Sequence, residues 1–124
     1  MTRVTSKYFS EREFQRLTPP CSLQDMNQDT MNRADIARRL AGIPFVVNCA
    51  YRSKDWDLSK GRSGNSAHTR GRALDFRCNT SENRMRMVSA LLQAGFNRIG
   101  IGKNFIHADD DPSLPRHVMW HYYE

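Results

Sequence analysis

The 124-residue sequence contains no run that approaches the roughly 20 consecutive apolar residues of a membrane-spanning helix. Only 39% of the residues are hydrophobic and the mean hydropathy is −0.71, values typical of a chain whose helices are amphipathic. No apolar stretch follows the basic residues near the N-terminus, so we expect no secretory signal and synthesis in the cytoplasm. We also expect no membrane partner. A chain of this length is expected to form one domain, 1–124, around a single core.

Cysteine is scarce. Cys21, Cys49 and Cys78 form no C-x-x-C pair, and an odd number of thiols cannot be fully paired within one chain. We therefore expect small buried thiols rather than a framework of disulfides.

Acidic residues are fewer than basic ones, 13 against 19, which gives a formal net charge of +6. The basic residues are scattered, however, and no block of five or six consecutive ones occurs. Such a diffuse positive field suits any polyanion, including an anionic cell wall. Since no nucleic-acid-binding motif accompanies the charge, we expect no nucleic-acid partner.

The hydrophobic spacing predicts an α+β fold, a small antiparallel sheet with flanking helices. Helices are expected from the capping-box residue Ser10 to about Leu17, over 28–41 and over 81–94, and strands over 45–50, 73–77, 98–101, 105–109 and 118–123. Residues 53–65 are polar and are expected to form a long loop. In the last helix, the residues expected to face the core are Met85, Val88, Leu91 and Leu92. Residues 1–42 form a helical lead-in and 43–124 the core of the domain.

Polar side chains interrupt two of the apolar strands. Asp75 lies between Leu74 and Phe76, and His107 and Asp109 share one face of the strand over 105–109 because side chains alternate. The loop histidine His68 precedes the first of these strands. Two neutral imidazoles and one carboxylate form a familiar catalytic zinc shell that leaves the fourth position to water. A divalent cation would also offset the cost of burying the Asp75 carboxylate.

Each of these residues has a structural alternative. A histidine in a strand is often hydrogen-bonded within the core, the acidic run after His107 suits a solvated strand end, and an aspartate after a polar loop often caps a turn. The zinc interpretation depends on the three groups occurring together in a chain that has only four histidines.

Several segments resemble the zinc D-alanyl-D-alanine carboxypeptidase-like peptidases of family M15. "SAHTRGRALDF" matches the family's Ser-x-His-x-x-Gly-x-Ala-x-Asp signature, and "NCAYRS" is similar to its Ser-Gly-Tyr-Arg-Ser segment. "GIGKNFIHADDD" resembles a segment of a small-domain branch found in phage and bacterial wall peptidases. Trp120 lies near the tryptophan that follows the last ligand in that branch. The resemblance extends from about residue 45 to 120.

This resemblance implies a hedgehog- and D-Ala-D-Ala-peptidase-like zinc site on the sheet, with His68, Asp75 and His107 as the Zn²⁺ ligands. Arg52 would bind the carbonyl oxygen or carboxylate of the substrate and stabilise the oxyanion. Ser66 would orient the loop that carries His68 or contact the substrate.

The sequence departs from the family at one position. Several members carry an acidic general base three residues before the last histidine ligand, where this chain has Asn104. Asp109 is the substitute candidate for this catalytic role, and the alternative is that it holds His107 in one tautomer. His117 and His121 are expected at the surface or in packing contacts. The alternative for His121 is that the terminal strand brings it near the zinc site.

The resemblance thus implies a zinc metallopeptidase that hydrolyses peptide bonds of bacterial peptidoglycan with metal-activated water, as an endolysin or as a wall carboxypeptidase or endopeptidase. We expect a monomer that reaches the wall through phage-type release. The alternative is a catalytically inactive wall- or zinc-binding domain of the same fold.

Overall fold

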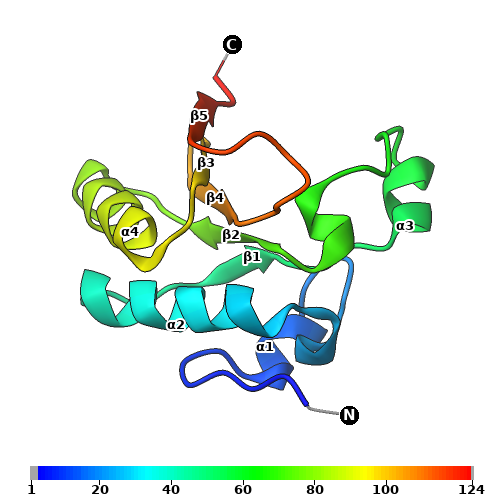
Figure 1. The fold of residues 1–124 in the computed structure, drawn as a ribbon, viewed down its shortest axis with the longest axis horizontal. Helices are drawn as coiled ribbons and strands as arrows, with labels where there is room; N and C mark the ends of the chain where they lie inside the picture. The colour runs from blue at the N-terminus through cyan, green and yellow to red at the C-terminus, as the bar shows by residue number, and fades with distance from the viewer. Residues whose placement is uncertain (1–2, 124) are drawn as a thin grey trace.

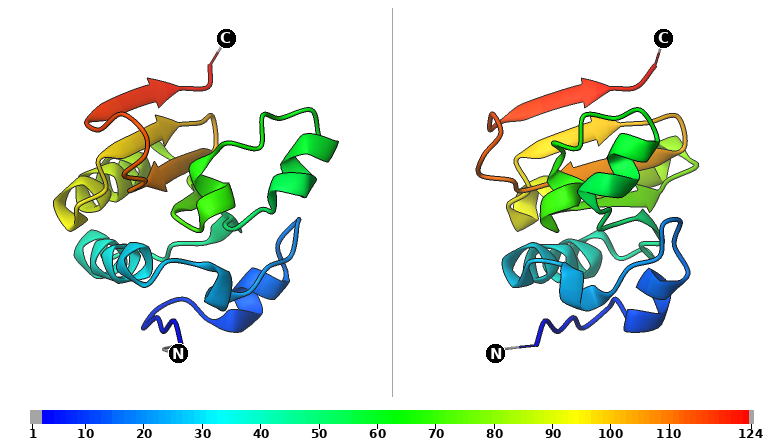
Figure 2. Two further views of the ribbon diagram at one scale, coloured as in Figure 1. Left: turned by 45° about the vertical axis from the view of Figure 1, so that its right-hand side comes forward. Right: turned by 90° about the vertical axis from the view of Figure 1, so that its right-hand side faces the viewer.

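The computed structural model describes residues 3–123, which form a five-stranded sheet flanked by helices (Figures 1 and 2). The elements in chain order are α1 (Glu11–Gln15), the 3-10 helix η1 (Leu23–Asp25), α2 (Gln28–Ala41), β1 (Val47–Cys49), α3 (Lys54–Ser59), the 3-10 helix η2 (Ala67–Arg70), β2 (Ala73–Arg77), α4 (Ser81–Ala94), β3 (Arg98–Ile101), β4 (Phe105–Asp109) and β5 (Val118–His121). The predicted α+β class is therefore confirmed. Within the described residues, no helix combines the length and the apolar character needed to cross a membrane.

The two long helices, α2 and α4, begin and end at the residues that the sequence indicates. The Asn27 side chain caps α2 by accepting hydrogen bonds from two backbone N–H groups, and the Thr80 hydroxyl caps α4 by accepting one from Asn83 N–H. Gly42 and Gly95 follow the two helices with φ of 68° and 107°, a conformation that glycine adopts without strain. The two helices pack against each other and cover one face of the sheet (Figure 1).

The sheet has the order β1-β2-β4-β3-β5, and the first four of these strands pair antiparallel as predicted. β5 instead pairs parallel to β3, so the small sheet is mostly antiparallel, with one parallel strand that the sequence did not predict. The reason is the position of the connection. β4 ends beside Arg98 at Asp109, and β5 begins beside the same residue at Val118, so the short segment between them returns the chain to the start of β3.

Three local predictions were wrong in detail. The expected loop over 53–65 contains α3, because the Ser53 hydroxyl accepts a hydrogen bond from Trp56 N–H and caps a helix. β1 and β5 are shorter than predicted. In α4 the buried face consists of Met87, Ala90 and Leu91, whereas Met85 is 74% exposed. Leu92 is also exposed, so the core-facing stripe is rotated from the predicted one.

The segment before residue 42 contributes large side chains to the same core as the sheet. Phe9, Phe14 and Leu23 are buried in it, and the ring centroids of Phe9 and Phe76 lie 5.9 Å apart. This segment also contacts the backbone of η2, since Asn27 N–H donates to the Gly71 carbonyl over 2.8 Å. The lead-in thus supports the turn that carries His68.

Gly71 is needed at this contact for two reasons. Its φ of 69° is in the left-handed region, and a Cβ at this position would lie 2.3 Å from the backbone oxygen of Asp25. Gly42 has nearly the same φ, 68°, but an added Cβ would meet no atom within 4 Å. A substitution at either glycine would introduce backbone strain, but only a substitution at Gly71 would also introduce a steric clash.

We predict that Gly71→Ala destabilises the protein much more than Gly42→Ala. The strain common to both variants costs roughly 1–2 kcal/mol, whereas the clash with Asp25 brings the loss for Gly71→Ala to about 3 kcal/mol or more. Urea unfolding followed by circular dichroism measures both free energies. Equal losses in the two variants would contradict the close backbone approach.

Candidate metal centre

Asp75 lies between the two histidines that the sequence predicts to share a metal with it. Its Oδ1 atom is 3.3 Å from His68 Nε2 and 2.9 Å from His107 Nδ1. The three residues come from η2, β2 and β4, and the antiparallel register places Asp75 directly opposite His107. The structure therefore brings together the three predicted ligands.

The outer nitrogen of each imidazole faces a hydrogen-bond acceptor. His68 Nδ1 lies 2.6 Å from the Ala50 carbonyl oxygen, and His107 Nε2 lies 2.6 Å from Asp109 Oδ2. Since a carbonyl and a carboxylate only accept, the neutral rings donate these N–H groups outward. The inner nitrogens, His68 Nε2 and His107 Nδ1, then present lone pairs toward Asp75 Oδ1.

Three electron pairs that converge in this way repel one another unless a proton or a cation lies between them. Ligand atoms about 2.0–2.1 Å from a tetrahedral zinc ion lie about 3.3 Å from one another. The distances of 3.3 Å and 2.9 Å from Asp75 Oδ1 to the two nitrogens are close to this value. Each histidine nitrogen therefore lies at a zinc-like spacing from Asp75 Oδ1, whereas the group whose ligand atoms all lie within 4.8 Å of one another consists of Cys49, His68 and Asp75.

The pKa values of the unliganded groups reflect the same convergence. Burial by itself lowers the pKa of His68, but the contact with Asp75, assisted by Cys49, raises it to about 10. Burial by itself raises the pKa of Asp75, but hydrogen bonds with His107 and His68 hold it well below its usual range. Without a metal, a proton on His68 offsets the carboxylate charge.

Asp109 contacts His107 from the side opposite to Asp75. It is 1% exposed, and while Oδ2 accepts from His107, Oδ1 accepts from Arg98 Nε over 2.8 Å and from the Asp111 N–H over 3.2 Å. Both oxygens are therefore occupied. This arrangement favours the role of holding the His107 tautomer over that of general base.

Cys49 belongs to this cluster, although sequence reasoning treated it only as a small buried thiol. Ligand atoms of Cys49, His68 and Asp75 all lie within 4.8 Å of one another. The sulfur is 3.9 Å from His68 Nδ1 and 3.5 Å from Arg52 Nη1. Cys49 lies on β1 opposite Asp75 in the register with β2, a pairing that the sequence alone does not reveal. All three cysteines are free thiols; Cys78 is buried as expected, and Cys21 and Cys49 are half-buried.

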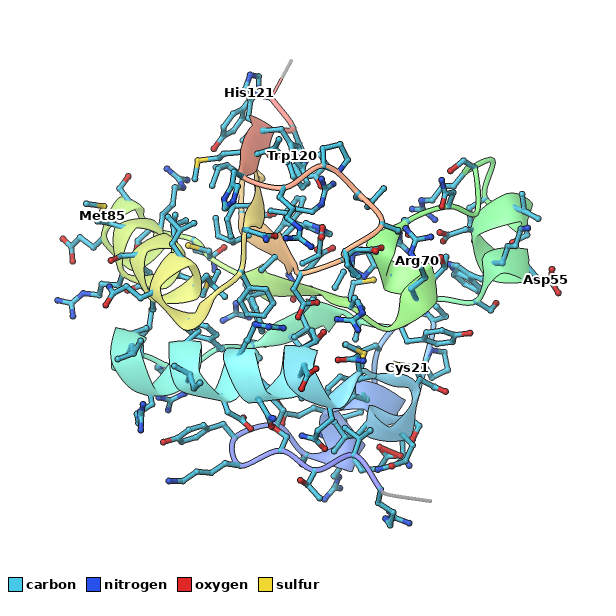
Figure 3. The ribbon with its side chains drawn as sticks, in the orientation of Figure 1. Cys21, Asp55, Arg70, Met85, Trp120 and His121 are labelled. Carbon is cyan, nitrogen blue, oxygen red and sulfur yellow. The ribbon has the colours of Figure 1, made fainter. Side chains whose placement is uncertain are left out.

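A cavity of about 500 Å³ opens over the cluster. Besides the three candidate ligands, the residues that line it include Arg52, Arg62, Ser66, Arg98, Asp109, Trp120 and Tyr122. The Trp120 ring on β5 lies 5.4 Å from the ring of His107 (Figure 3). Arg52 and Ser66, the predicted substrate-binding residues, are thus both on the wall of this cavity.

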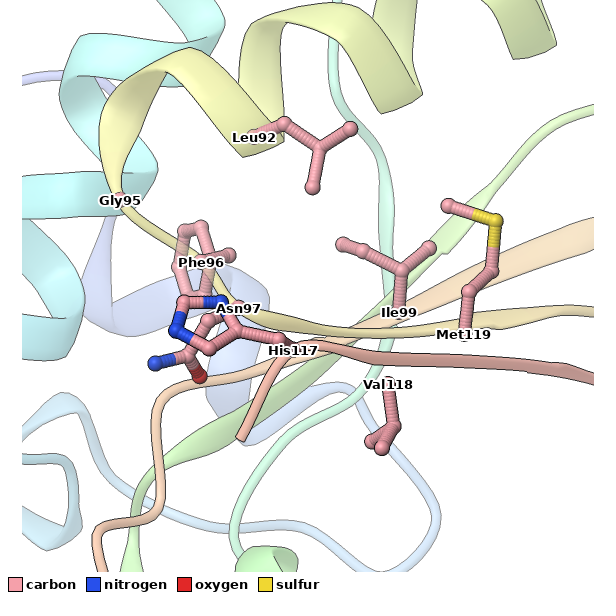
Figure 4. A pocket seen from close by; sticks show the side chains of 8 residues that line it. All are labelled: Leu92, Gly95, Phe96, Asn97, Ile99, His117, Val118 and Met119. Atoms are coloured by element: carbon pink, nitrogen blue, oxygen red, sulfur yellow. The ribbon is translucent and has the colours of Figure 1, made fainter. Parts of the chain in front are cut away.

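Three other residues that the sequence singled out lie elsewhere. Asn104 is exposed at the turn between β3 and β4 and does not line the cavity. His117 lines a separate cavity of about 440 Å³ beside α4 (Figure 4). His121 is exposed and stacks on Tyr123. These positions agree with the expectation that His117 and His121 lie at the surface.

Comparison with protein families identifies the chain's likeness to a known family. The model of a family described as Peptidase M15 matches residues 8–109. The match begins inside the helical lead-in, well before residue 45, and ends before Trp120. A search of curated proteins found no match.

We predict that Asp109→Asn weakens zinc binding by about 10- to 100-fold, because an amide no longer fixes the tautomer that presents His107 Nδ1 to the metal. Competition with a chromophoric chelator measures the affinity. Asp29→Asn, at an exposed position on α2, should bind zinc like the unsubstituted protein. If Asp109→Asn retained full zinc affinity but lost hydrolysis, Asp109 would be the general base instead.

Proposed function

Because the chain belongs to the peptidase M15 family, we propose that this peptidase is zinc-dependent and hydrolyses peptide bonds of bacterial peptidoglycan. The observation that supports zinc most directly is the convergence of His68 Nε2 and His107 Nδ1 on the Asp75 carboxylate. When bound there, zinc supplies an acidified water as nucleophile and polarises the scissile carbonyl.

The residues around the site have complementary tasks in this proposal. The Ala50 carbonyl and Asp109 hold the two imidazoles with their unprotonated nitrogens inward. Arg52, whose side chain is 14% exposed, places a positive charge on the cavity wall, where it binds a substrate carboxylate or the developing oxyanion. Ser66 offers a hydroxyl at the same wall.

The wall polymer as substrate is supported by charge. Arg52, Arg62 and Arg98 line the cavity, and the chain has a net charge of +6. A positive field attracts anionic wall polymers and favours peptides that carry free carboxylates. We further propose that the enzyme acts as a monomer and reaches the wall through phage-type release, as an endolysin does.

A zinc-binding domain without catalytic activity is the second candidate, and it is supported by the lack of an evident general base. Asn104 cannot take a proton, and both oxygens of Asp109 are occupied. Among residues 3–123, the other carboxylate on the cavity wall is Asp75, the candidate ligand. Zinc binding without release of new amino groups from sacculi would favour this alternative.

We predict that phenanthroline abolishes the release of amino groups from purified sacculi and that added zinc restores it, since the chelator removes the ion that activates water. Mass spectrometry of the muropeptides would identify the bond that is cut. Full activity of the metal-stripped protein would exclude the proposed chemistry.

His68→Ala is predicted to lose zinc and lower the hydrolysis rate by at least about 1,000-fold, because removing a ligand disrupts the ion that provides the main catalytic effect. His121→Ala is the matched control, as this exposed histidine lies on β5 outside the cavity. Equal loss of activity in both variants would contradict the assignment of the ligands.

A further inference from the structure

Asp57 is a buried carboxylate that neither the zinc cluster nor the family motif accounts for. It lies on the short helix α3, is 1% exposed, and belongs to the segment that the sequence predicts to be a loop. Its neighbour on the same helix, Asp55, is exposed and points away from the molecule (Figure 3). A buried carboxylate is costly unless other groups compensate its charge.

The groups that compensate Asp57 are those proposed to bind the substrate. Asp57 Oδ1 lies 2.9 Å from Arg52 Nε, and Asp57 Oδ2 lies 3.5 Å from the Ser66 hydroxyl, which donates to it. The Arg52 Nε–H does not point along the line to Oδ1, so charge attraction holds this contact rather than a linear hydrogen bond. One carboxylate therefore connects α3 to two residues of the cavity wall.

A second arginine, Arg62, also contacts Asp57. Arg62 N–H, two residues after the C-cap of α3, donates to the Asp57 carbonyl over 2.9 Å. The Arg62 guanidinium lies 3.9 Å from Asp57 Oδ1, and Arg62 lines the cavity. The Arg62 side chain is 50% exposed, so this ion pair is weak. The pair with Arg52 is the one that is shielded from solvent.

We propose that Asp57 is a positioning residue that sets the orientation of the Arg52 guanidinium, and with it Ser66, for binding a carboxylate or carbonyl oxygen of the peptide. This inference rests on the proposed function of the site. Asp57 lies at the Nε edge of Arg52, and Cys49 Sγ lies 3.5 Å from Nη1. The N–H groups of Nη2 and the second N–H of Nη1 then remain as donors for the substrate.

The physical advantage is preorganisation. An unconstrained arginine side chain loses rotamer freedom when it binds a ligand, whereas a guanidinium already held at one edge loses less. Without Asp57, Arg52 would be a largely buried charge with no carboxylate beside it, and it would turn toward solvent. Asp57 therefore acts on substrate binding through Arg52 and leaves the metal ligands unchanged.

The test compares Asp57→Asn with the matched control Asp55→Asn in the full-length zinc-loaded protein. For Asp57→Asn we expect KM for a soluble muropeptide to rise roughly tenfold to a hundredfold, with kcat lowered by less than about threefold. The zinc content should stay at the unsubstituted level. Asp55→Asn should match the unsubstituted protein in all three quantities.

A double-mutant cycle separates positioning from a general effect on folding. In an Arg52→Lys background, Asp57→Asn should raise KM further by no more than about twofold, because the guanidinium that it positions is already absent. An equal increase in both backgrounds, or a loss of kcat and zinc in Asp57→Asn with KM unchanged, would overturn the proposal.

A nuclear magnetic resonance measurement makes the test independent of turnover. The Arg52 Nε–H signal, assigned by its disappearance in Arg52→Lys, should be displaced from the position of exposed arginines by the carboxylate 2.9 Å from Nε, and should move to that position in Asp57→Asn. An unshifted signal would overturn the positioning role even if the protein hydrolyses peptides. If the protein did not hydrolyse peptides but the signal shifted as expected, the proposed function would be rejected and the contact between Asp57 and Arg52 would still be supported.

Discussion

The convergence of two imidazole lone pairs on one half-buried carboxylate is the interaction on which the rest of the structure depends. His68 and His107 each have an acceptor at the outer nitrogen, so neither ring can relieve the convergence by exchanging its tautomer without losing a buried hydrogen bond. The centre is therefore built for a positive charge at Asp75, whether a proton or a divalent cation.

Three elements, η2, β2 and β4, bring His68, Asp75 and His107 together. The register between β2 and β4 places Asp75 opposite His107, and the glycine that ends η2 allows a close backbone contact with the lead-in, which fixes the turn that carries His68. The opposite face of the same strands packs against the helices through Leu74, Phe76 and Ile106. Alternation along two strands thus separates the hydrophobic core from the polar site.

Much of this could be predicted from the sequence because the signals are local. The bounds of β2, β3 and β4 follow from short apolar runs between turn residues, and the three candidate ligands stand out as polar groups beside or within them. The contributions of Cys49 and Asp57 could not be predicted, since each depends on a partner far along the chain or on a short helix within a polar segment. The parallel direction of β5 likewise depends on where β4 ends.

The most direct test of the metal centre is X-ray absorption spectroscopy at the zinc edge of the loaded protein. If His68, Asp75 and His107 hold the metal, the spectrum will show one zinc per chain with two imidazoles and a carboxylate at about 2.0–2.2 Å and no sulfur neighbour. A sulfur at about 2.3 Å in place of one imidazole would contradict this assignment, because Cys49 would then replace His107 in the shell.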